Sequence, residues 1–310
     1  MTTTLPARQS RRPVIFTDPG PDMFAYFQEH GFAVLGEALS PAEVAEVTQD
    51  AERLCRGEYG TIDTDEQLTG AESPDEVLRR FLCIHHPHKV SDVAMAAMKH
   101  PRVVTALTGV IGPNVKAMQS MLFIKSEGKP GQAWHQDELF IPTRDRSLTA
   151  AWIALDDATV ENGCLWALPG SHRPGVLYPA REQTNPQFDC TTEAYDFPHR
   201  DEDAVPLEVP AGAAVLFNGY LLHRSLRNSG AHGYRRALVN HYMSAESLLP
   251  WRPPAEGTHM AAADYRDVVL VAGRDPHRHK GLEDLSRPHS RPDKDGGCDR
   301  PLAGPVKEPT

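Results

Sequence analysis

From residue 115 onward the chain consists of short runs of β-forming residues separated by glycine, proline, asparagine and aspartate. Most of these runs lie too close together for a helix to connect one to the next, which disfavours a parallel α/β sheet. We therefore expect an antiparallel barrel or a double-sheet roll. The predicted strands cover residues 115–125, 148–155, 164–168, 213–217 and 237–243.

The first third of the chain carries helix signals instead. Ser40 is followed by a proline and, three residues on, by Glu43, which is the pattern of a capping box. Apolar residues then recur every three or four positions, so a helix with one apolar face is predicted over 41–55. Further helices are expected at 21–29, where Gly31 can form a left-handed C-cap, at 73–82, at 91–99 and after Pro101.

Charge and composition exclude several classes of function. The 310 residues include 32 Lys and Arg against 42 Asp and Glu, a net charge of −10 that disfavours binding to nucleic acid. No apolar run approaches the roughly 18 residues that span a bilayer. No apolar stretch follows the basic N-terminus, so we expect a cytoplasmic protein without membrane attachment. No sequence feature specifies an oligomeric state.

Cysteine and histidine bear on metal chemistry in different ways. The five cysteines are widely spaced and form no C-x-x-C motif, which argues against a disulfide framework or a structural zinc site. Fifteen histidines is a high count, and histidine is the commonest metal ligand. The composition therefore favours a metal site without locating it.

The chain is predicted to form a single domain over 1–273. Its helical part runs to about 110, and its β core covers about 115–245. The polar insertion 179–206 has the length of a lid or binding loop. Residues 274–310 are rich in Pro, Arg, His and Asp and are expected to form a disordered tail.

The segment 134–137, Trp-His-Gln-Asp, is the strongest candidate for a chemical site. Strand positions i and i+2 face the same side, so His135 and Asp137 can bind one ion. A second histidine from another strand would complete two histidines and one carboxylate, which leaves three open positions and suits Fe(II) and oxygen chemistry. A second H-x-D motif, 199–201, lies in the insertion without a strand pattern, and we interpret it as a solvated loop.

His223 is the best candidate for the second histidine. It follows the apolar run 213–217 and a turn, and it precedes Ser225 and Arg235. Without Asp137 upstream, a structural histidine at a strand end would be the better interpretation. His241, six residues beyond Arg235, is the rival ligand. The cluster of His85, His86 and His88 fits a pocket wall or surface loop better than a ligand set.

Four ordered blocks carry a family resemblance. They are QSMLFIK at 119–125, WHQD at 134–137, LTAAWIALDDATVENGCLWALPGSH at 148–172, and H-x-S-x-x-N at 223–228 followed by RRA at 235–237. Together they resemble the phytanoyl-CoA dioxygenase family of Fe(II)- and 2-oxoglutarate-dependent oxygenases. The resemblance implies a mainly β fold with flanking helices around a double-stranded β-helix, the jelly-roll or cupin-like core.

The resemblance also implies a set of site residues. The matching positions make His135, Asp137 and His223 the iron ligands, with O2 as the oxidant. They place Arg235 on the distal carboxylate of 2-oxoglutarate, to which the guanidinium fork is suited. Four further residues are expected around this co-substrate: Ser225 sharing that carboxylate, Trp152 packing against it, and Gln119 and Lys125 in the pocket wall, although Lys125 fits a rim charge equally well.

The spacing of the arginine departs from the family pattern. Eleven positions usually separate the distal histidine from the arginine, whereas Arg235 lies twelve positions after His223. One extra residue in the turn 230–233, which contains two glycines, would restore the register. Arg236 is the alternative, but neighbouring strand residues face opposite sides, so only one arginine can point inward.

The implied reaction is hydroxylation of an unactivated C–H bond of a small molecule, with release of succinate and CO2. Desaturation, epoxidation or ring formation are alternative outcomes, and Asp137 leaves no vacancy for the halide that halogenation requires. Two other hypotheses are a non-catalytic jelly-roll protein with a structural metal and a cupin-type oxygenase or isomerase that does not use 2-oxoglutarate. The absence of a compact basic patch favours a free small molecule as substrate.

Overall fold

Two β-sheets packed face to face form the centre of the computed structural model, which describes residues 12–60, 62, 68–189, 191–247, 268–282 and 286–292. Within these residues the larger sheet has nine strands, and its paired neighbours are antiparallel except β1 with β2. In order across the sheet they are β1 (Ile15–Phe16), β2 (Phe32–Leu35), β11 (Ala214–Asn218), β6 (Thr149–Ala154), β13 (Arg235–Ser244), β4 (Val115–Lys125), β3 (Phe81–His85) and β15 (His289–Pro292), and β14 (Val269–Ala272) also pairs with β4.

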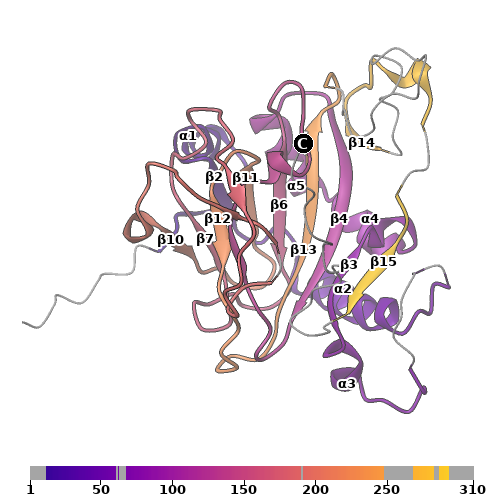
Figure 1. Cartoon of the computed structure of the whole chain (residues 1–310). Helices are drawn as coiled ribbons and strands as arrows, with labels where there is room; N and C mark the ends of the chain where they lie inside the picture. Colours follow the sequence, from indigo (N-terminus) through magenta and orange to yellow (C-terminus); the bar gives the residue numbers. More distant parts are fainter. Residues whose placement is uncertain are drawn as a thin grey trace, which may run out of the picture.

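The smaller sheet has four strands in the described part of the chain, all antiparallel. Their order is β10 (Val205–Leu207), β7 (Leu165–Ala167), β12 (His223–Ser225) and β5 (Gln132–His135). Figure 1 shows β7, β10 and β12 to one side of the long pair β4 and β13, with β15 beyond β3 on the other side. This arrangement confirms the predicted jelly-roll core.

Alternation along the strands of the larger sheet separates two apolar layers. Trp152, Val215 and Val239 pack with residues of the smaller sheet, whereas their neighbours Ile153, Leu216 and Leu238 pack with the helices. The period of two in side-chain direction therefore buries both faces of the sheet. The side chains of the larger sheet that reach the space between the two sheets come from the face that carries Trp152, Val215 and Val239.

The predicted helices are confirmed with one correction. They are α1 (Pro21–His30), α2 (Pro41–Cys55), α3 (Pro74–Leu78), α4 (Asp92–Met98) and α5 (Pro101–Val110). The Ser40 capping box forms, and Gly31 ends α1 with a φ of 82°. The helix expected over 73–82 ends at Leu78 because the apolar run that follows pairs with β4 as β3. The first third of the chain thus also supplies strands to the larger sheet.

The tail also departs from expectation. Residues 289–292 of the predicted disordered segment 274–310 form β15, which pairs with the free edge of β3. An edge strand offers unpaired backbone groups that another segment can satisfy. Residues 293–310 lie outside the described part of the chain.

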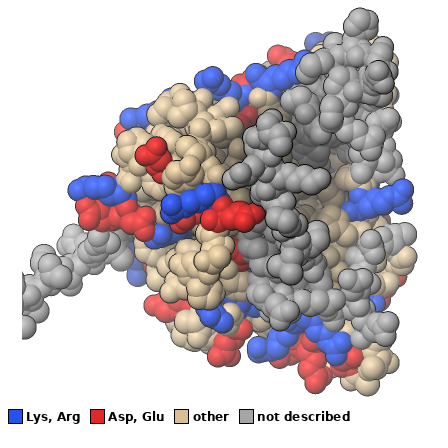
Figure 2. All heavy atoms as spheres, in the orientation of Figure 1, with Lys and Arg blue, Asp and Glu red and all other residues tan. Residues whose placement is uncertain are grey.

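No helix within the described residues is long and apolar enough to cross a membrane. On the face seen in Figure 2, basic and acidic side chains are interspersed.

Candidate metal and co-substrate site

His135 and His223 lie directly opposite each other on the neighbouring strands β5 and β12. Their ring centroids are 4.1 Å apart. Each Nδ1 contacts a backbone carbonyl two residues earlier, that of Ala133 at 2.7 Å and that of Leu221 at 3.0 Å. A carbonyl can only accept, so each Nδ1 carries the proton and each Nε2 keeps its lone pair. This tautomer is the one that a metal needs.

Asp137 completes the cluster from just beyond the end of β5. Its Oδ1 lies 3.7 Å from Nε2 of His135 and 3.6 Å from Nε2 of His223. One ligand atom from each residue lies within 4.8 Å of the other two, and no other such group of His, Cys, Asp or Glu occurs in the part of the chain that the structure describes. Asp137 begins a 3-10 turn, η2 (Asp137–Leu139), but the extended Gln136 before it still directs both side chains the same way.

Burial tunes these groups for metal binding. Desolvation lowers the pKa of His223, His135 beside it lowers it too, and together they bring it to about 4. Burial alone would raise the pKa of Asp137, but His223, His241 and His135 around it hold the pKa below its usual range. Neutral imidazoles and an ionised carboxylate are the protonation states of metal ligands. The donor set therefore fits a divalent transition metal that accepts nitrogen and oxygen.

The three donors face a cavity of about 320 Å³ between the two sheets. Its wall mixes apolar and aromatic side chains with neutral polar ones. The apolar members are Met121, Phe123, Phe140, Ile141, Trp152, Leu165, Phe217 and Val239, and the neutral polar ones include Gln119, Gln132 and Thr191, with His85 and His241 among the imidazoles. Asp137 and Arg235 are the acidic and the basic residue of this lining.

Arg235 and Lys125 form a cationic end of the site. Arg235 is buried, its Nε donates to the carbonyl of Gly163 at 3.1 Å, and its guanidinium lies 5.5 Å from the ring centre of Trp152. The Nζ of Lys125 donates to the carbonyl of Leu226 at 2.8 Å and to the hydroxyl of Ser225 at 3.0 Å. Neither cation forms an ion pair with a carboxylate of the described residues.

Two unpaired cations in a dry site are costly to charge. Burial lowers the pKa of Arg235 to about 10, and burial together with Arg235 moves the pKa of Lys125 well below its usual range. An incoming carboxylate would relieve this cost, because it supplies the missing negative charge. This end of the cavity is therefore suited to an anion.

Gly163 holds both cations with one backbone group. Its carbonyl accepts from Arg235 and, at 3.5 Å, from Lys125. Its φ of +85° and the carbonyl of Leu226, 2.4 Å from the place of a Cβ, leave no room for a side chain. The turn that contains Gly163 is thus part of the site.

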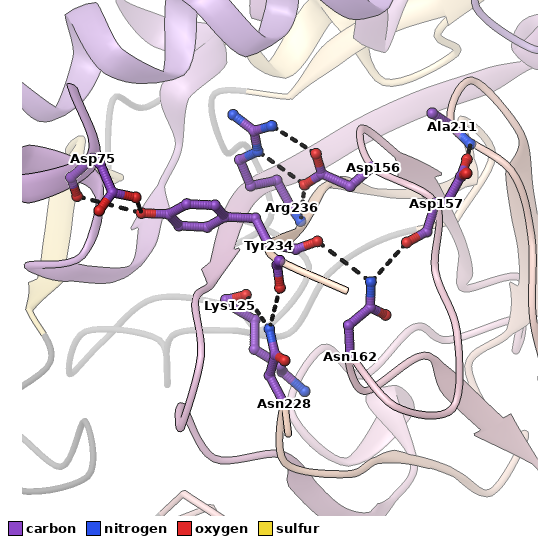
Figure 3. Close-up of polar contacts among 10 residues, drawn as sticks. Asp75, Lys125, Asp156, Asp157, Asn162, Ala211, Asn228, Tyr234 and Arg236 are labelled. Atoms are coloured by element: carbon purple, nitrogen blue, oxygen red, sulfur yellow. Dashed lines mark hydrogen bonds and ion pairs between the residues drawn. The ribbon is translucent and has the colours of Figure 1, made fainter. Parts of the chain in front are cut away.

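Arg236 points away from the cavity, as the alternation along β13 requires. It binds Asp156 through Nε at 2.9 Å and Nη2 at 2.6 Å. Figure 3 shows this pair, and also Asn162, which holds the carbonyl of Tyr234 just before Arg235. The structure thus turns Arg235 inward, despite the twelve-residue spacing.

The sequence-predicted residues fall into two groups. Arg235, Trp152 and Gln119 line the cavity together with the three predicted iron ligands, whereas Lys125 and Ser225 lie beside Arg235 outside the lining. Strand alternation could have found the wall residues that sequence reasoning missed: Met121 and Phe123 share the parity of Gln119, and Val239 shares that of Arg235.

Asp201 of the second H-x-D motif is not merely solvated. Its Oδ1 accepts from Trp134 Nε1 at 2.9 Å, and its Oδ2 accepts from Arg224 at 2.7 Å. Trp134 and Arg224 are the immediate neighbours of His135 and His223 on the opposite faces of their strands. The insertion is therefore attached to the outer side of the strands that carry the predicted ligands.

Comparisons with known proteins agree with this geometry. The model of the family described as Phytanoyl-CoA dioxygenase (PhyH) matches residues 27–237. Phytanoyl-CoA dioxygenase 1 of Oryza sativa subsp. japonica is 40% identical over 131 residues, which cover 42% of this chain and 45% of the rice protein. The chain thus matches less than half the length of that relative.

A longer match links the chain to Phytanoyl-CoA dioxygenase domain-containing protein 1 of Bos taurus, which is 30% identical over 272 residues covering 75% of this chain and 92% of the bovine protein. Among solved structures, the epimerase SnoN in complex with Fe3+, alpha ketoglutarate and nogalamycin RO has the same fold, with a TM-score of 0.58, 20% identity and coverage of 82% and 96% of the two chains. The resemblance noted in the sequence is therefore confirmed, and the chain belongs to the phytanoyl-CoA dioxygenase (PhyH) family.

Proposed function

We propose that this protein is an Fe(II)- and 2-oxoglutarate-dependent dioxygenase that hydroxylates a C–H bond of a small molecule and releases succinate and CO2. One observation carries the proposal: His135, Asp137 and His223 face the same cavity as Arg235, a cation without a carboxylate partner among the described residues. A metal site alone fits many proteins. A metal site that shares a cavity with a buried arginine fits a co-substrate that must reach both.

We assign the three ligands to Fe(II), which when bound would supply the O2 activation that couples decarboxylation of 2-oxoglutarate to oxidation of the substrate. His135 and His223 offer Nε2 in fixed tautomers, and Asp137 offers Oδ1. Three protein ligands would leave positions on such an ion for the co-substrate and O2.

Arg235 is assigned to the distal carboxylate of 2-oxoglutarate. Its Nε is held by Gly163, which leaves the Nη groups to bind the carboxylate. Trp152 limits the width of the site beside the guanidinium. Ser225 and Lys125, hydrogen-bonded to each other, lie close enough to Arg235 to add positive potential and a hydroxyl. Gln119 lies six residues before Lys125 on β4 and pairs with His241, so it is better placed for the substrate than for this carboxylate.

The substrate is proposed to be a free, uncharged small molecule that carries hydrogen-bonding groups. Once Asp137 and Arg235 are assigned, the lining offers neutral polar groups such as Gln119 and Thr191 beside apolar ones such as Ile141 and Phe140. A substrate charge inside the cavity would lack a partner there, which is costly in a dry site. Two solved structures of the same fold are of enzymes from nogalamycin biosynthesis, which agrees with a free small molecule. A cytoplasmic location is part of the proposal.

The test is anaerobic addition of Fe(II) and 2-oxoglutarate to the apoprotein, followed by absorption spectroscopy. The expected result is the weak visible metal-to-ligand band, absent in H135A, and slow succinate formation once O2 is admitted. A band without any succinate would favour the non-catalytic metal-binding protein. Oxygen uptake that neither requires 2-oxoglutarate nor responds to R235A would favour the cupin-type enzyme instead.

A further inference from the structure

The two oxygens of Asp137 face different partners. Oδ1 is directed at Nε2 of His135 and His223, at 3.7 Å and 3.6 Å. Oδ2 lies 3.1 Å from Nε2 of a third imidazole, His241. His241 does not belong to the group of three donors that can share an ion, so its contact with the carboxylate is of another kind.

The backbone of β13 directs His241 to this place. Arg235, Val239 and His241 are separated by even steps, and all three line the cavity. His241 pairs with Gln119 of β4 on one side and with Ala150 of β6 on the other. Partners on both sides fix the backbone at His241 and so the direction in which its side chain leaves the strand.

The surroundings of the two ring nitrogens of His241 decide which of them carries the proton. Its Nδ1 is buried and contacts no hydrogen-bond partner among the residues that the structure describes, whereas Nε2 contacts Asp137. The ionised carboxylate can only accept, so Nε2 must be the protonated nitrogen. The ring therefore acts as a donor to Asp137.

We propose that His241 is a positioning residue that holds Oδ2 of Asp137 and so presents Oδ1 alone to the metal. This inference rests on the proposed metal site. A carboxylate free to rotate could bind through both oxygens and fill one of the three open positions. Hydrogen bonds from groups behind a metal ligand orient that ligand, and their loss typically weakens metal binding or activity about 10- to 100-fold.

The same strand then serves both ends of the cavity. Arg235 and His241 are six residues apart on β13, a span of about 20 Å along a strand. One holds the distal end of the co-substrate, and the other holds the carboxylate that binds the metal. The strand therefore fixes the distance between Arg235, which binds the co-substrate, and His241, which holds the metal-binding carboxylate.

The experiment measures Co(II) binding to the apoprotein by calorimetry and by the visible d–d spectrum of the complex. We expect H241L to weaken Co(II) binding about 10- to 100-fold and to change the spectrum, because Asp137 is released. H241Q should restore affinity to within a few-fold, because a glutamine amide can donate from nearly the same place as Nε2. H241N, whose amide is too short to reach, should behave like H241L and serves in its place if H241L does not fold.

The matched control is H85L, which removes another histidine of the same cavity wall that comes from β3. Its Co(II) affinity should equal that of the unchanged protein. Unchanged affinity in H241L, or equal losses in H241Q and H241L, would overturn the positioning role. Retention of Co(II) by H223L with complete loss in H241L would make His241 a ligand and also overturn it. If H135L binds Co(II) normally, the metal site itself is wrong, which is a separate outcome.

Discussion

The strands β5, β12 and β13 present two faces that differ in how their polar groups are satisfied. On the outer face, the carboxylate of Asp201 binds Trp134 and Arg224, and Asp156 binds Arg236. On the cavity face, the neighbouring residues His135, His223 and Arg235 leave nitrogen atoms directed at open space. The same strands thus carry structural charges on one side and groups that await a ligand on the other.

Whether a polar side chain has a partner within the protein therefore indicates a binding role better than the type of residue does. Arg235 and Arg236 are chemically identical and adjacent, yet only Arg236 has a carboxylate partner among the described residues. A buried cation that no protein group neutralises costs folding energy. Such a cost is expected at a site where a bound ligand supplies the missing negative charge.

The largest expected effect comes from comparing the two faces of β5, where His135 faces the cavity and Trp134 faces outward. H135A should reduce Co(II) or Fe(II) affinity by more than about 100-fold, because a direct ligand is lost and not merely a group behind it. W134F, which removes the Nε1 donor on the outer face, should leave metal affinity unchanged. Calorimetry on both apoproteins decides the matter, and equal losses in the two variants would contradict the division into faces.

The next largest effect tests the adjacent arginines. R235A should raise the KM for 2-oxoglutarate by at least about 30-fold, since removing one partner of a buried charged contact costs about 2 kcal/mol or more. Metal affinity should not change, because Arg235 lies at the other end of the cavity from the ligands.

R236A is the control for that prediction. The Arg236 and Asp156 side chains are 16% and 20% exposed, so loss of their pair should lower the free energy of unfolding by about 1 kcal/mol. The KM for 2-oxoglutarate should stay the same. A higher KM in R236A with a normal one in R235A would reverse our choice of arginine.

A smaller effect is expected at Asp201. D201A removes the acceptor of both Trp134 and Arg224. Because the Asp201 side chain is 64% exposed, the free energy of unfolding should fall by only about 1 kcal/mol. The melting temperature should fall by about 2 to 4 °C, and metal affinity should hold within a few-fold. H199A, a change in the same motif, is the control for both measurements. A loss of metal affinity in D201A would show that the outer face of these strands does affect the cavity face.

The smallest effect concerns pH. The pKa of Lys125 is depressed in the free protein, so above that pKa the amine is neutral and binding of the 2-oxoglutarate dianion should take up a proton. Affinity should therefore fall as pH rises through the depressed pKa, by no more than about tenfold per pH unit for one proton. Calorimetry in buffers of different ionisation enthalpy measures the uptake. K125M should abolish it, and an unaltered uptake in K125M would assign the proton elsewhere.

Local signals in the sequence were sufficient for much of the fold and for the centre of the site. Ser40 and Glu43 predicted the start of α2, and the long β-type run at 115–125 predicted β4 with both its ends. Alternation predicted that His135 and Asp137 would share a side and that only one of Arg235 and Arg236 could point inward.

Contacts between distant segments could not be predicted in this way. Nothing near Asp201 in the sequence indicates that its carboxylate reaches Trp134, 67 positions away. The pairing of β15 with β3 likewise depends on an edge that exists only once the sheet has formed, and so does the conversion of residues 81–82 from expected helix to the start of β3. The direction of the Lys125 ammonium, towards Ser225 and Leu226, is of the same kind.

The backbone carbonyl of Gly163 has a consequence for anyone who surveys this protein by mutagenesis. It is the shared anchor of Arg235 and Lys125, and neighbouring atoms exclude any side chain at that position. A methyl group there would displace two positive charges at once without altering either of them. An alanine scan would thus report this glycine as essential for binding the proposed co-substrate, although it contributes no side chain to the pocket.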